Sequence, residues 1–166
     1  MQGYRFWENL AWLITFDAMQ ELNFPRYTFR FKNSENKPFI FDPVRKKFVR
    51  LTPEEWVRQH TLNYLINHYN YPLSLINVEK EMRLHGTKKR YDIVVFNSDG
   101  SINIIVECKA PEVPVTQTTF DQIARYNLAL ESTYLMVTNG LQHYYCLLDY
   151  TEEKYVFLKE IPAYCP

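Results

Sequence analysis

The sequence predicts a single α/β domain built around a mixed β-sheet, and three observations lead to this fold class. The chain has 166 residues, of which 46% are hydrophobic and 16% aromatic, which is enough for one folded domain with a hydrophobic core. Strand-like segments come before, between and after two helix-like segments, which is the order of an α/β domain with a mixed sheet. Dense Ile/Val runs in residues 89–96 and 102–109 indicate strands that helices cover on both faces.

The first part of the chain divides into an N-terminal segment and a β-rich extension. Residues 1–18 contain the apolar run "LAWLITF", which is too short to span a bilayer and is flanked by Glu8 and Asp17. We expect an amphipathic helix that packs on the domain, with no signal peptide and no membrane partner. Residues 19–52 form the extension, where the turn-prone "NSEN" separates the first two of three short strands, expected at 26–33, 37–43 and 46–51.

The first core helix begins with a capping sequence. Thr52 is a suitable N-cap, Pro53 suits the first helical position, and Glu55 completes a capping box. Tyr71 and Pro72 mark its end, because the residue before a proline disfavours the helical conformation. The apolar stripe of this helix consists of Leu62, Leu65, Ile66 and Tyr69.

The remaining elements complete a core that we place at residues 53–166, packed with the extension as one domain. A second helix is expected at 118–131. The core strands are expected at 75–84, 89–96, 102–109, 133–140, 143–150 and 154–160.

Charge and cysteine content limit the function classes. The formal net charge is +0, so any affinity for nucleic acid must come from a local basic patch. Two short runs qualify, "RKK" at 45–47 and Lys88, Lys89 and Arg90, although such runs are usually solvated loops. The 3 cysteines have no C-x-x-C spacing, which argues against a disulfide framework or a zinc knuckle and favours a reducing cytoplasm.

A hairpin loop predicts a cluster of charged residues. Asp99 and Gly100 are a preferred two-residue loop, and a tight loop there places Asp92 opposite Glu107 on the neighbouring strand. Directly opposed residues have Cβ atoms roughly 5 Å apart. Lys109 follows Glu107 by two positions and shares its face in a regular strand.

Two opposed carboxylates repel each other, so this arrangement needs a compensating charge. A lysine compensates partly, and Mg²⁺ does so better, because it is commonly held by one or two carboxylates together with water and phosphate oxygens. The alternative is a solvated ladder of surface charges, and a single strand bulge would move Asp92 to the other face.

The segments "YDIVVF" and "IIVECKAP" resemble the signature of the PD-(D/E)xK nuclease superfamily, with Tyr91 where that signature often has proline. From "IFDPVRKKFVRLTPEEWVRQH" through "VECKAPEVPV" to "FDQIARYN" and "YLMVTNG", the chain is similar to the N-terminal nuclease domain of type I restriction enzyme R subunits. The resemblance covers roughly residues 20–148 and leaves residues 1–18 outside it.

The resemblance implies a restriction-endonuclease-like core, with a central four-stranded mixed sheet flanked by helices, and a DNA phosphodiesterase dependent on Mg²⁺ or Mn²⁺. It carries over Asp92 and Glu107 as metal ligands and Lys109 as the residue that orients or activates water. It also implies a helical glutamate, either Glu54 or Glu55. Helical geometry favours Glu55, which lies within about 20° of the apolar stripe, whereas a capping role with Thr52 is the competing interpretation.

The second helix contributes two further candidates. Gln122 and Tyr126 match a Gln-x-x-x-Tyr element, which in the family lies near the metal or the DNA backbone, and they share one helix face. Alternatively, Gln122 supports an N-cap at Thr119 and Tyr126 is a core residue.

We therefore expect a stand-alone Mg²⁺-dependent DNA endonuclease of the restriction or DNA-processing type. Its partners would be DNA and separate restriction or repair subunits. The alternative is a catalytically weak or inactive DNA-binding or partner-binding module with the same fold. The sequence contains no G-x-x-x-x-G-K-[ST] phosphate loop, G-x-S-x-G elbow or H-E-x-x-H pair, so nothing in it predicts those chemistries.

Overall fold

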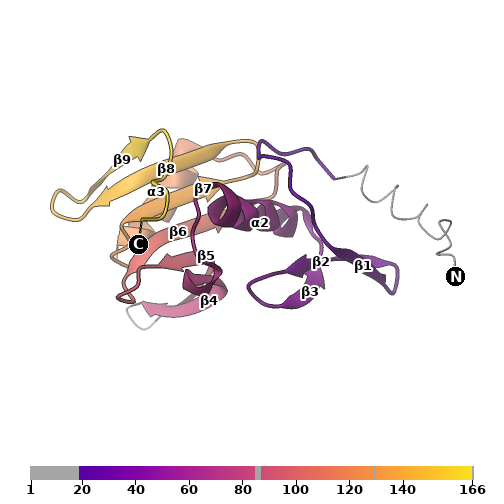
Figure 1. Ribbon diagram of the computed structural model, residues 1–166. Coiled ribbons are helices and arrows are strands. Elements are labelled where there is room, and N and C mark those ends of the chain that lie inside the picture. The colour runs from indigo at the N-terminus through magenta and orange to yellow at the C-terminus, as the bar shows by residue number, and fades with distance from the viewer. Residues whose placement is uncertain (1–18, 85–86, 129, 166) are drawn as a thin grey trace, which may run out of the picture.

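The structure is a computed structural model that describes residues 19–84, 87–128 and 130–165 (Figure 1). The helix expected in residues 1–18 lies outside the described residues. Two sheets are present in the described part. The smaller consists of β1 Phe31–Ser34, β2 Lys37–Asp42 and β3 Lys47–Arg50. The larger consists of β4 Ile76–Leu84, β5 Thr87–Phe96, β6 Ile102–Cys108, β7 Tyr134–Thr138, β8 His143–Asp149 and β9 Lys154–Leu158.

The two expected helices are present as α2 Pro53–Asn63 and α3 Gln117–Leu128. A π-helical turn, Tyr64–His68, continues α2, and a short 3-10 helix, Leu73–Leu75, follows it. Such a turn widens the end of a helix, and here it leads to the predicted stop at residues 71–72. In the described part of the chain, no helix is long and apolar enough to cross a membrane.

The larger sheet is mixed, with the strand order β4-β5-β6-β7-β8-β9. The β6 and β7 strands run parallel and are joined through α3, whereas the other neighbours in this sheet are antiparallel. The sheet therefore has six strands, and a separate central sheet of four strands is not observed in the described residues. The strand segments were predicted individually, but hairpin pairing adds every one of them to a single six-stranded sheet.

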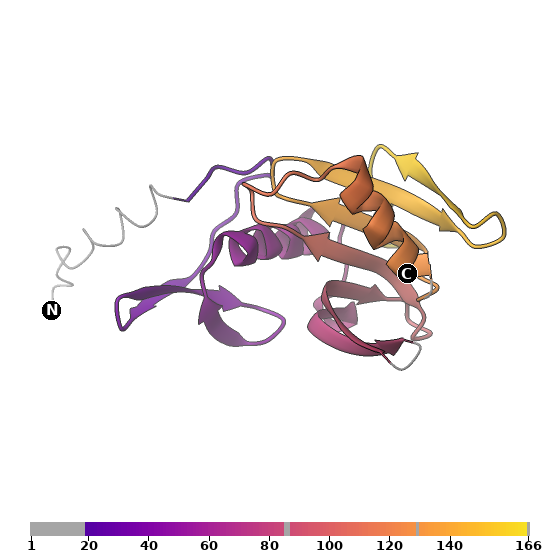
Figure 2. The ribbon, with the colours of Figure 1, turned by 180° about the vertical axis from the view of Figure 1, so that it is seen from behind.

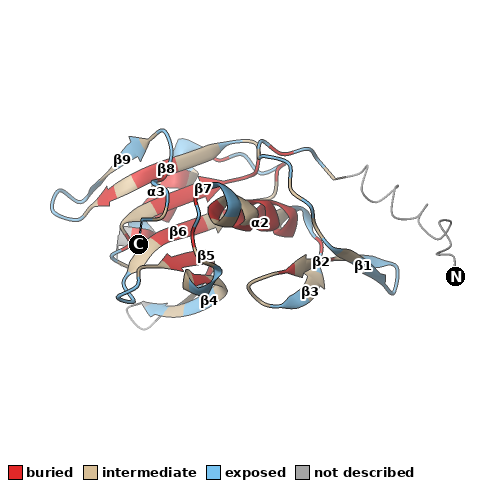
Figure 3. Ribbon diagram, viewed as in Figure 1, coloured by how far each residue is buried: buried red, intermediate tan, exposed pale blue. Residues whose placement is uncertain are grey.

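Helices cover opposite faces of this sheet. Side chains of α2 pack with Ile93, Ile104 and Val106 in one core cluster, and side chains of α3 pack with Val94 and Ile105 in the other. Figure 1 shows α2 in front of the sheet, and Figure 2 shows α3 in front from the opposite side. The inner strands and α2 are the most buried elements (Figure 3), and for the strands this is what their Ile/Val runs predict.

The loop between β5 and β6 differs from the expected two-residue turn. Asn97 donates its amide to the carbonyl of Ser101 at 2.8 Å, so three residues form the loop, with Gly100 at a φ of 87°. A register shift between Val95 and Phe96 then compensates for the longer loop. From Val95 back to Ile93, β5 therefore pairs with β6 in the register that a two-residue loop would have produced.

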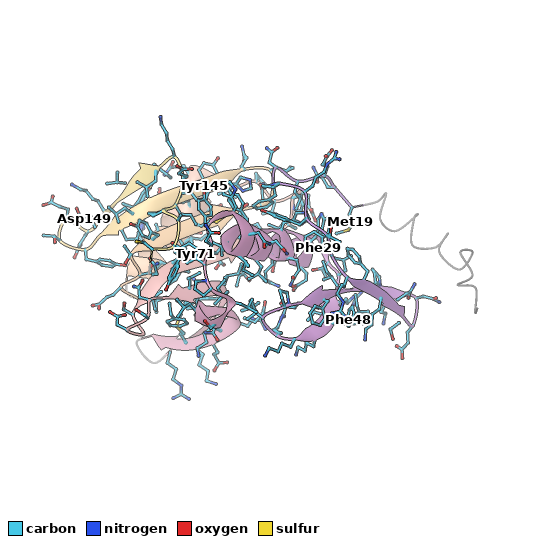
Figure 4. All side chains as sticks on the ribbon, in the orientation of Figure 1. Met19, Phe29, Phe48, Tyr71, Tyr145 and Asp149 are labelled. Carbon is cyan, nitrogen blue, oxygen red and sulfur yellow. The ribbon has the colours of Figure 1, made fainter. Side chains whose placement is uncertain are left out.

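The extension packs against α2 and the larger sheet. The expected first strand is shorter than predicted, because residues 26–30 run as an extended segment before β1 begins. This segment places the Phe29 ring 5.0 Å from Trp56 and 4.6 Å from His60 on α2. Figure 4 shows Phe29 beside α2, where apolar contact ties the smaller sheet to the core.

Candidate active site

The candidate site lies where β5 and β6 separate. Their pairing ends at Ile93 and Val106, whereas β6 continues beside β7 until Cys108 lies opposite Thr138. The amide of Cys108 donates to Asp92 Oδ2 at 2.7 Å. The carboxylate of Asp92 therefore fills the fork and satisfies a backbone donor of β6 at the point where β5 has diverged.

The alternation of β5 breaks at Asp92. Tyr91 belongs to the core cluster on the α3 side and Ile93 to the cluster on the α2 side, although residues two apart in a regular strand share a face. The register of β4 with β5 skips Asp92 and Glu79, and Glu79 has a φ of 55°. The single face expected for Asp92 and Glu107 is therefore not observed, because this irregularity turns Asp92 toward α2.

Glu107 and Lys109 form the other half of the site. Lys109 Nζ lies 3.3 Å from Glu107 Oε1, and the Glu107 side chain is only 15% exposed. Its second oxygen, Oε2, is buried and has no hydrogen-bond partner among the described residues. Burial raises the pKa of Glu107 and the charge of Asp92 raises it further, while Lys109 and Lys89 act in the opposite direction. The site therefore holds a carboxylate that lacks part of its counter-charge.

Arg58 on α2 is the centre of an acidic cluster. Its guanidinium Nη2 lies 2.7 Å from Asp92 Oδ1 and 3.0 Å from both Glu54 and Glu79, and its Nη1 donates to Glu55. Burial lowers the pKa of Arg58, but the charges of Asp92 and Glu55 outweigh this and raise it above its ordinary value. One buried cation thus links the helix to the fork.

Arg58 was not among the residues that the sequence predicted. Its sequence signal is the spacing: it follows Glu54 by four residues and Glu55 by three, which places all three on neighbouring positions of one helix. The contacts with Glu79 and Asp92 have no such local signal, because they join segments that are distant in the sequence.

Glu55 points into the molecule, whereas Glu54 does not. The side chain of Glu55 is 7% exposed and that of Glu54 is 46% exposed. Thr52 caps α2 by accepting the Glu55 amide at 3.1 Å, while the Glu55 carboxylate accepts from Arg45 at 2.7 Å and from Gln59 at 2.9 Å. The backbone of Glu55 thus serves the cap and its side chain serves the buried cluster. Its catalytic role remains a prediction.

The basic run of residues 88–90 lies within β5, not in a loop. Lys88 pairs with an acidic side chain of β4 at 2.8 Å, and Arg90 pairs with Glu79 at 2.6 Å. Lys89 points to the other face, with its Nζ 4.7 Å from the centre of the Tyr91 ring. Strand alternation therefore divides this run between two faces, and its role in DNA binding stays a prediction.

The structure describes the side chain of Gln122 on α3 but not that of Tyr126. Gln122 is exposed, and the side chain of Tyr126 lies outside the described residues. The helix begins one residue earlier than expected, at Gln117, and Thr116 Oγ1 accepts the amide of Thr119 at 3.2 Å, which puts Thr116 in the N-cap position. The alternative in which Thr119 is the N-cap is therefore wrong.

The side chains at the fork are of the types that a two-carboxylate cation site needs. No group of three or more His, Cys, Asp or Glu side chains that could hold a metal occurs in the described ranges. Two carboxylates with water and phosphate oxygens satisfy Mg²⁺, however, and the unpartnered Oε2 of Glu107 is a ready oxygen ligand. Asp92 would be the second ligand, although its oxygens already bind Arg58 and the Cys108 amide.

Fold and site together define an α/β domain with carboxylates and a lysine where two central strands separate. A family model described as the type I restriction enzyme R protein N terminus (HSDR_N) matches residues 53–162. The chain belongs to this family, and residues 19–52 precede the match.

A solved fragment of an HsdR subunit of a type I restriction enzyme from Vibrio vulnificus YJ016 is similar, with a TM-score of 0.49 and 22% identity. The similarity covers 68% of this chain and 24% of that one, so the chain spans about a quarter of the solved fragment. No curated protein matches the chain.

Proposed function

We propose that this chain is a metal-dependent DNA endonuclease of the PD-(D/E)xK type, which uses Mg²⁺ or Mn²⁺ held by Asp92 and Glu107. The observation that carries the proposal is the buried, unpartnered Oε2 of Glu107, which lies in a carboxylate-lysine cluster at the strand fork. Membership in the restriction R-protein family supports DNA as the substrate. R subunits belong to restriction systems of several subunits, so the other subunits of such a system are the expected protein partners of this chain.

The roles of the residues follow from what each can donate or accept. When bound, a divalent cation would offset charge on the phosphate and lower the pKa of a water molecule. Lys109 Nζ, beside Glu107, can donate to that water or to a phosphate oxygen. Water oxygen bonds to phosphorus, the bond to one ester oxygen breaks, and that oxygen leaves with a proton. Arg58 is a positioning residue, since it fixes the carboxylate of Asp92.

One observation favours a different function, a module that binds DNA or a protein partner without cutting. Both oxygens of Asp92 already accept strong hydrogen bonds, at 2.7 Å from Arg58 and 2.7 Å from Cys108. A carboxylate held in this way is stable without a metal. The two functions differ in whether the purified protein cuts DNA.

The test is metal-dependent nicking of supercoiled plasmid. We expect the wild type to nick DNA with Mg²⁺ or Mn²⁺, and Lys109→Ala to be slower by about a hundredfold or more, the usual effect of removing one group that stabilises the transition state. Lys154→Ala is the matched control, because Lys154 is an exposed lysine on β9 with only an exposed partner, Glu152. Circular dichroism and thermal melting establish that each variant is folded.

Two outcomes would contradict the proposal. If the wild type does not nick duplex or single-stranded DNA with either metal, with or without candidate partner subunits, the binding-module function is correct. If wild type and Lys109→Ala cut equally, the activity belongs to a contaminant or to another site. Calorimetry with Asp92→Asn/Glu107→Gln tests the ligands separately: equal Mn²⁺ binding to this variant and to the wild type would exclude the fork as the metal site.

A further inference from the structure

The extension that precedes the family match is strongly basic. Residues 19–52 contain eight basic and three acidic residues, whereas the whole chain has a net charge of +0. The basic residues are Arg26, Arg30, Lys32, Lys37, Arg45, Lys46, Lys47 and Arg50, and the acidic residues are Glu21, Glu35 and Asp42. The extension thus has an excess of basic residues, and it precedes the residues that the family model matches.

The smaller sheet separates these charges from its apolar side chains. Phe31 pairs with Ile40 and Ile40 with Val49, and this face packs into the main core, where Ile40 is 0% exposed. The next residues along each strand, including Lys32 and Arg50, point to the opposite, outer face. The outer face is defined by Arg30, Lys32, Phe39, Phe41, Phe48 and Arg50.

On the outer face, cations lie over aromatic rings. The Arg30 guanidinium is 4.4 Å from the centre of the Phe41 ring, and Lys32 Nζ is 4.9 Å from that of Phe48 and 5.5 Å from that of Phe39. Phe48 marks this sheet in Figure 4. Such contacts hold long side chains in place while their charged ends stay exposed to solvent.

No acidic side chain occurs on the outer face within the described residues. Glu35 lies in the turn between β1 and β2, and Asp42 is buried on the inner side of β2. The cations of this face therefore have no carboxylate opposite them on their own sheet. The face is complementary to a polyanion.

The smaller sheet is joined rigidly to the candidate active site. Asp42, at the end of β2, accepts from Arg45 at 2.7 Å and from Gln59 of α2 at 2.9 Å. Arg45 in turn pairs with Glu55 at 2.7 Å. This bridge joins the inner side of the sheet to the acidic cluster around Arg58.

We propose that the outer face of the β1–β3 sheet binds the phosphate backbone of duplex DNA. The charge complementarity selects a polyanion, and the proposed nuclease activity selects DNA, so the identity of the ligand rests on the proposed function. A duplex is favoured over a single strand because the rings already carry Arg30 and Lys32 and are not free to stack on bases. Backbone contacts of this kind bind without reading sequence.

The experiment measures binding of fluorescent duplex DNA by anisotropy in EDTA, across a range of salt concentrations. We expect Arg30→Gln/Lys32→Gln to weaken binding by about tenfold or more and to reduce the salt slope by about 1.8, since each phosphate contact contributes about 0.9. The matched control is Lys154→Gln/Lys159→Gln, which removes the same charge from exposed lysines near β9. This control should bind almost as the wild type does.

Four outcomes of the binding experiment would overturn the assignment. Equal losses in the two variants would mean that net charge alone drives binding. If Arg30→Gln/Lys32→Gln loses as much affinity for polyglutamate or for anionic vesicles as for DNA, the face is a general polyanion surface. If the wild type binds single-stranded DNA more tightly than duplex DNA, the face is a stacking site. If the wild type does not bind duplex DNA at low salt, the inference fails. Binding in EDTA is independent of cleavage, so a protein that binds duplex DNA in EDTA but does not nick plasmid with Mg²⁺ or Mn²⁺ would refute the proposed nuclease and leave this inference intact.

Discussion

We expect Glu107 to destabilise the fold in a way that a bound cation would relieve. Its Oε2 is buried without a partner, and its pKa is raised by burial and by Asp92. The charged form is therefore disfavoured in the folded state at neutral pH. We expect Glu107→Gln to raise the melting temperature in EDTA by about 2–4 °C, the shift that roughly 1 kcal/mol gives in a domain of this size.

With bound metal, the wild type should become more stable than Glu107→Gln. Mn²⁺ at about 100 times its Kd should stabilise the wild type by about 2.7 kcal/mol and Glu107→Gln much less. Glu152→Gln, an exposed carboxylate on the β8–β9 turn, is the control and should leave both measurements unchanged. A lower melting temperature for Glu107→Gln in EDTA would show that its carboxylate is already compensated within the fold.

At the scale of the element, the first turn of α2 distinguishes two adjacent glutamates. Glu55 accepts hydrogen bonds from Arg45, Arg58 and Gln59, whereas Glu54 has one pair with Arg58 and is half exposed. We expect Glu55→Gln to lower the free energy of unfolding by about 2–4 kcal/mol, because it leaves buried guanidinium groups short of counter-charge. Glu54→Gln should change it by less than about 1 kcal/mol.

Urea unfolding measures both values, and each variant is the control for the other. Equal losses would contradict the inward orientation of Glu55. Metal binding gives an independent test of function. If Glu54→Gln weakens Mn²⁺ binding while Glu55→Gln does not, then Glu54 is the functional glutamate of this helix.

The sequence predicts local elements better than it predicts how they meet. The cap at Thr52 and the inward face of Glu55 follow from helical spacing, so both could be anticipated. The length of the loop at Gly100 could not be anticipated, because the same residues are compatible with a two-residue and with a three-residue turn. The register shift at Val95 offset that error, which is why the pairing at Ile93 was still predicted.

The orientation of Asp92 could not be predicted from the sequence either, because it also depends on how separate segments meet. Regular alternation would have placed Asp92 and Glu107 on one face, but the irregularity at Glu79 turns Asp92 toward Arg58. A positive φ at a glutamate has no local sequence signal, since glycine and asparagine are the usual residues there. Contacts between distant segments decide such features, and spacing within one segment does not report them.

At the scale of the whole molecule, two histidines hold the segment before β1 against the core. His143 bonds to the carbonyl of Asn23 through Nε2 at 2.7 Å and to Thr138 Oγ1 through Nδ1 at 2.8 Å. His60 bonds to the carbonyl of Trp56 at 3.0 Å and lies among aromatic rings. A neutral imidazole satisfies each of these sets of contacts, with one nitrogen donating to a carbonyl.

Acid should therefore weaken the whole fold. Burial lowers the pKa of both His60 and His143 from the ordinary value of 6.5, against a smaller opposing effect of their backbone hydrogen bonds. The unfolded chain then binds protons more readily, so their contribution to stability is complete above pH 6.5 and is lost as the pH falls below it. Two such groups give a slope of at most about 2.7 kcal/mol per pH unit.

The measurement is urea unfolding between neutral and mildly acidic pH in the Glu107→Gln background, because the raised pKa of Glu107 acts in the opposite direction. We expect His60→Gln/His143→Gln to flatten the dependence of stability on pH, whatever its stability at neutral pH. His68→Gln, at an exposed histidine of the π-helical turn, should keep the slope of its parent. If His68→Gln flattens the slope and the double variant does not, the buried histidines are not the acid-sensitive groups that hold the extension in place.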